Sequence, residues 1–170
     1  MGLDPVKLEL DLAGFDPLAV PVPRLRPPLR VTTLAELQDT PGNRHRIYEL
    51  NKACSADIPE RGEFFSYAEY VERRFETDTF RADGQILVID EDTMTGMCAV
   101  SYREDRSWAF IEMTGVLPSH RRRGLATLLK VNALTTAQRW GARTVRTINH
   151  PANNPILTAN RRLGFRVADF

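Results

Sequence analysis

The segment EMTGVLPSHRRRGLA, residues 112–126, combines residue types that bind anions. Three arginines, Arg121, Arg122 and Arg123, precede Gly124 and a long apolar helical pattern. Backbone N–H groups at a helix N-terminus have no partner inside the helix, and the positive end of the helix dipole favours negative charge. Glycine lets a backbone approach a ligand closely. The segment therefore predicts a pyrophosphate site made of backbone donors at the start of a helix.

Hydrophobic patterns predict the elements that hold this loop. Strands are expected at residues 29–34, 85–90, 96–102, 108–117, 144–148 and 165–170, and helices at residues 44–54, 66–75, 124–140 and 154–163. Ser66 and Glu69 form a capping box, and Gly141 fits the end of the long helix. That helix is a crossover, which leaves the strands on either side of it parallel. The order predicts a mixed sheet covered by helices, with the arginine loop at a strand's carboxyl end, where such sheets bind ligands.

Two further segments precede this order. Residues 6–12 alternate apolar and polar side chains, which is the period of a half-buried strand, and a strand must dock on a sheet. Residues 17–28 hold five of the eleven prolines and predict a stiff linker. We therefore divide the chain into an N-terminal strand segment (1–16), a proline-rich linker (17–28) and a main domain (29–170). The strand can dock on its own sheet or on that of a second copy, and strand exchange would make a homodimer.

Composition and charge restrict the function classes. The 170 residues allow one sizeable core, and a formal net charge of +1 disfavours a nucleic-acid-binding protein. No apolar run approaches the ~20 residues of a membrane span, and the N-terminus lacks a signal-peptide pattern, so we expect no membrane partner and a cytoplasmic location. Cys54 and Cys98 have no His or Cys at metal-binding spacing. They are expected to be reduced core residues, and no metal site is predicted.

Two motifs resemble those of the Gcn5-related N-acetyltransferase (GNAT) superfamily. Residues 121–126 (RRRGLA) fit its acetyl-CoA signature: Gln or Arg, two arbitrary residues, Gly, one arbitrary residue, then Gly or Ala. Asn154 and residues 163–165 (LGF) stand where members often begin and close their penultimate helix. The resemblance covers residues 30–170 in element order. It implies acetyl-CoA or CoA as cofactor and a GNAT-like α/β fold, a mixed, mostly antiparallel sheet of about six to seven strands flanked by helices on both faces.

The resemblance also assigns residues to the cofactor. It implies that the loop binds the CoA pyrophosphate, that Val116 pairs with the pantetheine arm and that Asn154 contacts the cofactor. Val116 suits this role because Pro118 ends strand pairing, which leaves the polar backbone groups of Val116 free for an amide-containing ligand. The residues expected to bind the cofactor are Thr114, Val116, Arg121, Arg122, Arg123, Gly124, Leu125, Ala126, Thr127 and Asn154.

The N-terminal strand predicted at residues 6–12 also resembles a feature of the superfamily. Superfamily members commonly finish with two strands, and this chain has room for one after residues 163–165, so the strand at 6–12 could fill the other place. Residues 13–15 (AGF) also echo residues 163–165 (LGF). This arrangement resembles the junction between lobes of tandem acetyltransferases, and it predicts that the chain corresponds to a second lobe with the tail of a first.

Glu112 is the candidate general base. An amine that attacks a thioester must lose a proton, and a carboxylate can accept it directly or through water. Glu112 lies four residues before Val116 on one predicted strand, so both side chains are expected on the same face. An ion-paired or solvent-facing structural carboxylate is the alternative.

A general acid is missing from its usual place. The family often has a tyrosine five residues before the closing Phe165, where it protonates the departing thiolate, and this chain has Asn160 there. An amide cannot donate a proton as an acid. His150 is expected to be a loop residue rather than a catalyst. The acid can therefore be solvent, another group or none at all, and the candidate tyrosines are Tyr48, Tyr67 and Tyr102.

Residues 57–70 lie between the first two helices, where the superfamily commonly builds its acceptor site. Acidic side chains at Asp57, Glu60 and Glu63 could attract a cationic amine, and aromatic ones could line a slot. The candidate substrate-binding residues are Asp57, Phe64, Phe65 and Tyr67. A helix connection whose aromatic rings fill the core is the alternative.

These features predict an N-acetyltransferase that moves an acetyl or other acyl group from acetyl-CoA to a primary amine. The expected partner is a small-molecule amine, which attacks the thioester directly in a ternary complex. The alternative is a non-catalytic acyl-CoA-binding or sensory lobe, which Asn160 in place of tyrosine favours.

Overall fold

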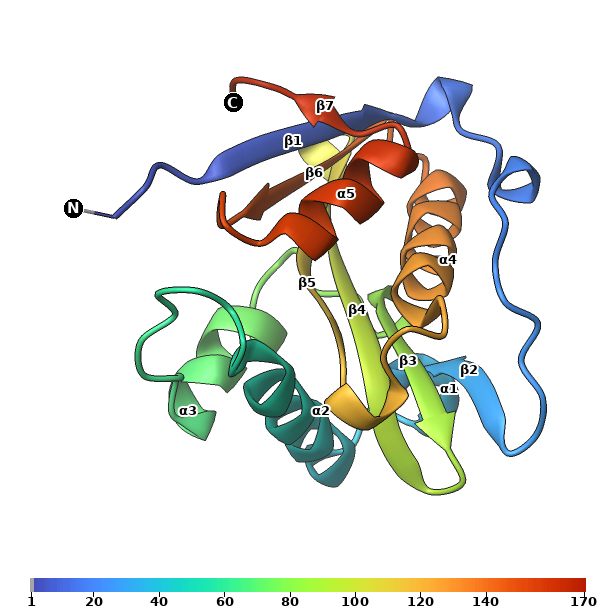
Figure 1. The fold of residues 1–170 in the computed structure, drawn as a ribbon. Helices are drawn as coiled ribbons and strands as arrows, with labels where there is room; N and C mark the ends of the chain where they lie inside the picture. Colours follow the sequence, from blue (N-terminus) through green and yellow to red (C-terminus); the bar gives the residue numbers. More distant parts are fainter. Residues whose placement is uncertain (1) are drawn as a thin grey trace.

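A computed structural model describes residues 2–170 of the chain. Its centre is a seven-stranded sheet in the order β2-β3-β4-β5-β6-β1-β7 (Figure 1). All neighbouring strands are antiparallel except β5 and β6, which are parallel as predicted. The strands are β1 (Val6–Asp11), β2 (Leu29–Thr33), β3 (Gln85–Asp90), β4 (Thr93–Arg103), β5 (Trp108–Val116), β6 (Thr144–Asn149) and β7 (Arg166–Val167). The predicted mixed, mostly antiparallel α/β architecture is confirmed.

Local sequence signals set the helix ends. Ser66 caps α3 with the predicted box, in which its hydroxyl accepts a hydrogen bond from the Glu69 N–H at 3.2 Å and the Glu69 carboxylate accepts one from the Ser66 N–H at 2.9 Å. Gly141 ends α4 at a left-handed φ of 89°. The four-residue α1, capped by Thr33, was not predicted. The helices are α1 (Leu34–Leu37), α2 (Pro41–Ser55), α3 (Tyr67–Tyr70), α4 (Leu125–Trp140) and α5 (Asn154–Arg162).

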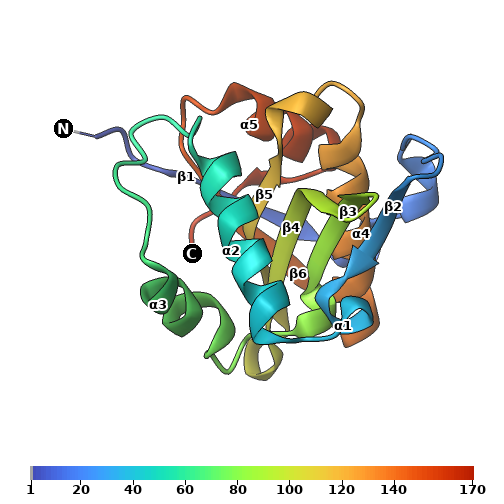
Figure 2. The same cartoon turned by 90° about the horizontal axis from the view of Figure 1, so that it is seen from below.

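The sheet has a hydrophobic core on each face. Alternate β4 side chains point to opposite faces, so that Cys98 and Val100 belong to the core that contains α4, while Met97 and Ala99 belong to the core that contains α2. Figure 2 shows α2 and α4 on different sides of the central strands. None of the helices in residues 2–170 is both long and apolar enough to cross a membrane.

β1 fills a place inside the sheet. It lies between β6 and β7 and is antiparallel to both strands of the same chain. Its alternation follows the sequence pattern, because Leu8 and Leu10 are buried while Lys7 and Glu9 are half-buried. Strand exchange and the homodimer stay predictions, since a strand from a second copy would make the same pairs.

The linker between β1 and β2 packs along α4 rather than standing apart from the domain (Figure 1). Val20 and Leu25 contact the core that contains α4. The Cδ atom of Pro23 lies 3.1 Å from the position that a Cβ on Gly124 would occupy. The linker thus contributes to the wall behind the arginine loop.

β5 carries a bulge at Glu112. Ala99 pairs with Met113 and Val100 pairs with Ile111, so Glu112 is an extra residue without a partner on β4. A bulge shifts the alternation of side chains along the bulged strand. Val116 consequently packs in the core that contains α4, whereas Glu112 reaches the segment that follows α3. The prediction that Glu112 and Val116 share a face is wrong, because a four-residue spacing holds only in an unbulged strand.

Candidate functional site

The carboxyl-terminal ends of β5 and β6 separate. Their parallel pairing ends at Ile111 and Thr147, although β5 continues to Val116 and β6 to Asn149. On the other side of β5, the Leu117 N–H donates to the Thr95 carbonyl at 2.8 Å. Hydrogen bonds alternate along an antiparallel pair, so the polar backbone groups of Val116 point away from β4 and into the opening.

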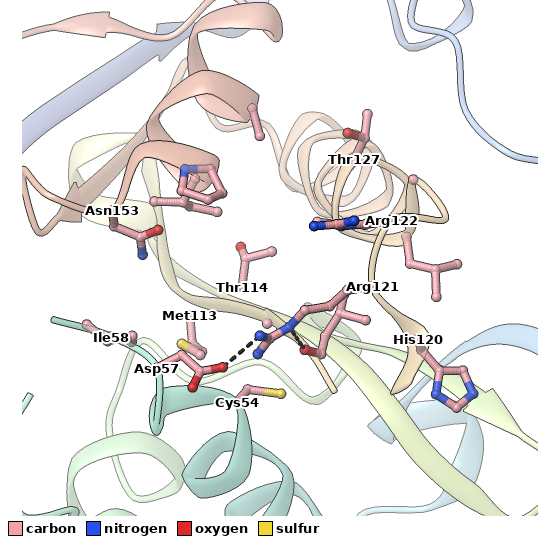
Figure 3. Close-up of a pocket in the computed structure, with 18 of the residues that line it drawn as sticks. Cys54, Asp57, Ile58, Met113, Thr114, His120, Arg121, Arg122, Thr127 and Asn153 are labelled. Atoms are coloured by element: carbon pink, nitrogen blue, oxygen red, sulfur yellow. Dashed lines mark hydrogen bonds and ion pairs between the residues drawn. The ribbon is translucent and has the colours of Figure 1, made fainter. Parts of the chain in front are cut away.

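A cavity of about 570 Å³ lies beside the end of β5 that β6 leaves unpaired (Figure 3). Four segments form its walls: the end of α2 with the following loop, the end of β5, the arginine loop with the first turn of α4, and the start of α5. Arg123 and Asn154 are exposed and do not line it. The predicted cofactor residues on its walls are Thr114, Val116, Arg121, Arg122, Gly124, Leu125, Ala126 and Thr127.

The first turn of α4 presents free donors to the cavity. The Gly124 carbonyl accepts the first hydrogen bond of the helix from the Leu128 N–H at 3.1 Å. The N–H groups of Leu125, Ala126 and Thr127 therefore have no partner inside the helix. All three residues line the cavity. Such a row of donors at a helix N-terminus suits a phosphate or pyrophosphate.

Gly124 is required by the backbone and by the linker. Its φ of 75° lies in the left-handed region, where a side chain is strained. A Cβ on Gly124 would also meet Pro23 at 3.1 Å. Close approach of a ligand is therefore not the only reason for a glycine at position 124, because Pro23 of the linker lies beside it.

The Arg121 side chain points towards Asp57 (Figure 3). Its Nε donates to the Val116 carbonyl at 2.9 Å, and its Nη1 donates to the Asp57 carboxylate at 2.6 Å. The guanidinium thus contacts both the edge of β5 and the loop after α2. The prediction that the Val116 carbonyl is free is therefore wrong, because Arg121 donates a hydrogen bond to it. Asp57, predicted to attract an acceptor amine, lines the cavity and is the ion-pair partner of Arg121.

Asn153, and not the predicted Asn154, lines the cavity. Asn153 is the N-cap residue of α5, its side chain makes no capping hydrogen bond, and it lines the cavity. Asn154 is the first residue of the helix and points outward, with an exposed side chain. Two consecutive asparagines before Pro155 gave no sequence signal that distinguishes them.

Cys54 is a cavity residue that the sequence placed only in the core. It is 5% exposed and lies under Gly115, where an added Cβ would come within 2.5 Å of the Cys54 Cβ. Burial raises the pKa of the Cys54 thiol to about 11. The thiol is therefore protonated at neutral pH and is a poor nucleophile.

Glu112 makes the contacts of an ion-paired carboxylate. It accepts a hydrogen bond from Arg74 Nη1 at 2.5 Å and another from Ser101 Oγ at 2.9 Å. The side chain is about a third exposed (31%) and does not line the cavity. This geometry agrees with the structural alternative and leaves Glu112 on the side of β5 that faces α3.

The predicted acceptor aromatics pack with the helices. Phe64, Phe65 and Tyr67 are half-buried against the core that contains α2, and none of them lines the cavity. The ring centroids of Phe64 and Tyr67 lie 5.6 Å and 5.3 Å from that of Tyr48. These rings therefore agree with the alternative prediction, in which the helix connection fills the core with aromatic side chains.

The candidate acids of the sequence are engaged elsewhere. Tyr48 donates to the Phe65 carbonyl at 2.6 Å, and Tyr102 stacks on Trp140. Tyr67 lies near the Pro41 carbonyl, at 3.4 Å, far along α2 from the cavity. His150 Nε2 lies 3.1 Å from Glu60 Oε2, a contact that joins the loop after α2 to the loop after β6 and agrees with the loop role expected for His150.

The segment from residue 44 to residue 165 matches the model of the acetyltransferase (GNAT) family. The chain belongs to this family. Both sequence motifs, residues 121–126 and residues 163–165, fall within the match. No curated protein is significantly similar to the chain in sequence.

Solved structures of GNAT proteins share the fold. A tandem GNAT protein from the clavulanic acid biosynthesis pathway is 25% identical, with a TM-score of 0.70 over 97% of this chain and 50% of its own. A GCN5-related N-acetyltransferase from Sphaerobacter thermophilus is 19% identical, with a TM-score of 0.67 over 98% of this chain and 50% of its own. AAC(6')-Iy in complex with a bisubstrate analog, CoA-S-monomethyl-acetylneamine, is 20% identical, with a TM-score of 0.56 over 84% of this chain and 96% of its own.

This GNAT chain spans about half the length of the first two of these structures. It therefore corresponds to one lobe of the tandem protein in extent and fold. That it is a second lobe with the tail of a first stays a prediction. Within the GNAT fold, the separated strands, the free donors of α4 and the N-terminus of α5 meet in one cavity.

Proposed function

We propose that the chain is an N-acetyltransferase that moves an acetyl, or another acyl, group from acyl-CoA to the primary amine of a small molecule. One observation carries the proposal: three residues of α4 whose N–H groups have no intrahelical partner line the same cavity as the end of β5 that β6 leaves unpaired. Membership of the family supports acyl transfer as the chemistry.

The cavity residues suit the parts of CoA. The N–H groups of Leu125, Ala126 and Thr127, with Arg122 beside them, would hold the pyrophosphate. Thr114 and Val116 of β5 would pair with the amides of pantetheine, because their polar backbone groups point away from β4. Arg121, which bonds the Val116 carbonyl, would have to share or release it when the arm binds.

Direct attack in a ternary complex is the proposed reaction. The acceptor amine attacks the thioester carbonyl carbon, and its surplus proton passes to Glu112 directly or through water. Glu112 lies on the face of β5 opposite the core that contains α4, where it contacts Arg74. The proposed base and the proposed cofactor loop would therefore act from different faces of one strand.

The test measures thiol release from acetyl-CoA with a panel of small amines, together with CoA affinity by calorimetry. Gly124→Ala should weaken CoA binding about tenfold or more, because strain at the left-handed position and contact with Pro23 displace the α4 donors. Gly14→Ala is the matched control, since a Cβ there meets nothing within 4 Å. Equal CoA affinity in both variants would contradict the proposed pyrophosphate site.

Glu112→Gln separates a role of Glu112 as general base from a structural role in contacts with Arg74 and Ser101. The amide keeps the size of the side chain and can still contact Ser101, and loss of a general base should lower kcat by about 100-fold while acetyl-CoA affinity is unchanged. An unchanged kcat would remove Glu112 from the mechanism.

A non-catalytic acyl-CoA-binding lobe is the second candidate. Glu112 bonded to Arg74 and Ser101, and Asn160 in the usual place of an acidic tyrosine, favour it. Tight CoA binding without acceptor-dependent thiol release from any amine in the panel would select this function.

A further inference from the structure

Two guanidinium groups share one aromatic ring in the segment that joins α2 to α3. The Cζ atom of Arg61 lies 5.5 Å from the Phe65 ring centroid and 4.9 Å from that of Phe64. The Cζ atom of Arg73 lies 4.8 Å from the Phe65 ring centroid. Stacking engages the face of a guanidinium, whereas its hydrogen bonds form in its plane. The rings therefore hold these cations in place and leave their N–H donors for another group.

Arg61 has a buried donor without a partner. Its Nε is buried and makes no hydrogen bond, and its side chain forms no ion pair within residues 2–170. Burial lowers the pKa of the Arg61 guanidinium, and the neighbouring charge of Arg74 lowers it further. Like charges held together beside a buried donor are costly unless an anion compensates them. The surroundings of Arg61 therefore favour an anion.

Arg74 connects this cation to the proposed base. Arg74 donates to the Glu112 carboxylate at 2.5 Å. Burial is the main cause that raises the pKa of the Tyr70 phenol, and the charges of Arg74, Glu112 and Arg61 act on the same phenol. The side chains of Arg74 and Glu112 are 22% and 31% exposed, and Arg61 is half-buried. The cluster of Arg61, Arg74 and Glu112 is therefore open to a ligand from solvent.

This cluster borders the cavity. The Arg61 N–H donates to the Ile58 carbonyl at 3.3 Å, and both Ile58 and Pro59 line the cavity. On β5, Met113 lines the cavity and directly follows Glu112. Arg61 and Glu112 thus lie within two residues of the cavity wall. An acceptor bound at the cluster would lie next to the proposed cofactor site.

The acids predicted to attract a cationic acceptor are engaged or exposed. Asp57 pairs with Arg121 at 2.6 Å, and Glu60 Oε2 lies 3.1 Å from His150 Nε2. Glu63 is exposed to solvent. The unpaired charge that the fold partly buries here is therefore positive, which is opposite in sign to the expectation from the sequence.

We propose that the acceptor is a primary amine that also carries an oxyanion, a carboxylate or a phosphate, which Arg61 and Arg74 bind while the amine lies beside Glu112. This inference rests on the proposed acyltransferase function and names the class of its acceptor. Guanidinium groups bind both oxyanions through paired N–H donors. Because Arg74 bonds Glu112, an oxyanion on Arg74 brings an amine a few bonds away to the proposed base.

The test compares amines that differ in a single anionic group. L-alanine is matched with ethylamine, and O-phosphoethanolamine with ethanolamine, each with saturating acetyl-CoA and with thiol release as the readout. In at least one pair, kcat/KM of the anionic member should exceed that of its partner by about tenfold or more, because hydrogen bonds between charged groups are strong. The pair that shows the preference identifies the oxyanion. Equal values within both pairs, or turnover only of the members without an oxyanion, overturn the inference.

Variants of Arg61 show whether this residue makes the preference. Arg61→Gln removes the charge and should raise KM for the favoured anionic amine by about tenfold, with kcat/KM for its partner amine unchanged. Arg61→Lys keeps the charge and should retain part of the preference. A merely structural Arg61 would lower the turnover of both members alike. The control is Arg106→Gln, between β4 and β5, whose side chain is 67% exposed, and it should match the wild type.

A second readout does not depend on turnover. Calorimetry with the CoA-loaded protein should show that L-alanine or O-phosphoethanolamine binds about tenfold more tightly to the wild type than to Arg61→Gln. The CoA affinity and the melting temperature of the variant verify that it is folded.

The outcomes separate the two proposals. Thiol release with an amine, together with an equal preference in the wild type and Arg61→Gln, overturns the oxyanion site alone. CoA binding without thiol release overturns the proposed function, and calorimetry then decides about the site. Binding of an anionic amine that depends on Arg61 supports the site, and equal or absent binding by the two proteins overturns it.

Discussion

Glu112 and Lys130 are charged residues on opposite sides of the same strand, and the protein surrounds them differently. Glu112 is partly exposed and has two partners, Arg74 and Ser101. Lys130 is fully buried and has no hydrogen-bond partner among residues 2–170. A paired group holds elements together, here the segment after α3 against β4 and β5. An unpaired buried group costs stability.

The same contrast holds for the neutral groups nearby. On the Glu112 side, Ser55 donates to Asn51 at 3.0 Å and Asn51 donates to the Tyr70 hydroxyl at 2.7 Å, so this buried network joins α2 to α3. On the Lys130 side, Asn160 keeps an unpaired carbonyl oxygen. The stabilities of four variants should therefore differ in sign as well as in size.

Lys130→Met should have the largest effect and should stabilise. Replacing an unpaired buried ammonium by an apolar side chain of similar length should raise the free energy of unfolding by about 1–3 kcal/mol near pH 7. Burial lowers the pKa of Lys130 in the folded state from its ordinary 10.5. The unfolded chain therefore binds more protons between the two values, and wild-type stability rises with pH there.

Denaturant unfolding of the wild type and Lys130→Met over a pH series measures this effect. The advantage of the variant should shrink as pH rises towards 10.5. A variant less stable than the wild type at every pH would show that Lys130 has a stabilising partner.

Arg74→Met should destabilise. It leaves the Glu112 carboxylate with Ser101 alone, but the pair is partly exposed, so the expected loss is about 1–2 kcal/mol by urea denaturation. Arg162→Met, at an exposed position on α5, serves as the control and should stay within about 0.5 kcal/mol of the wild type. Equal effects of the two substitutions would mean that the ion pair is not structural.

Ser101→Ala should cost less, about 1 kcal/mol, because it removes one hydrogen bond of 2.9 Å to Glu112. A double-mutant cycle with Arg74→Met, also by urea denaturation, tests whether the two contacts act as one unit. Strictly additive losses would argue against a shared cluster.

Asn160→Leu should have the smallest effect on stability, within about 0.5 kcal/mol. It loses the hydrogen bond to Asn149 but also removes the unpaired carbonyl, and these changes oppose each other. The melting temperature measures the balance. A large drop in the melting temperature would show that Asn160 stabilises the fold. The polar residues on the two sides of β5 would then both be structural.

Much of the fold was predictable because its signals are local. The alternation of residues 6–12, the Ser66–Glu69 capping box and Gly141 each act over a few residues, and each appears in the structure as expected. The loop before α4 was predictable for the same reason, since a glycine in the left-handed region and free helix donors follow from the order of residues 121–127.

The burial of Lys130 could have been suspected from the sequence, although the apolar pattern of α4 as a whole does not show it. Ala126, Ala133 and Ala137 lie on one face of α4 at helical spacing, and Lys130 interrupts that face. A charged residue inside an otherwise small, apolar stripe signals a buried charge. Hydrophobic periodicity averages over such a residue, so it could not show that the side chain would be left without a partner.

The sequence by itself determined the elements, their order and the loop before α4, because hydrophobic period, capping and glycine backbone preferences depend on near neighbours. Only the tertiary structure decided that the bulge turns Glu112 away from Val116, that Arg121 meets Asp57, and that Lys130 Nζ is buried without a hydrogen-bond partner among residues 2–170. Each of these depends on register or on contacts between distant segments. No local preference specifies where two such segments meet.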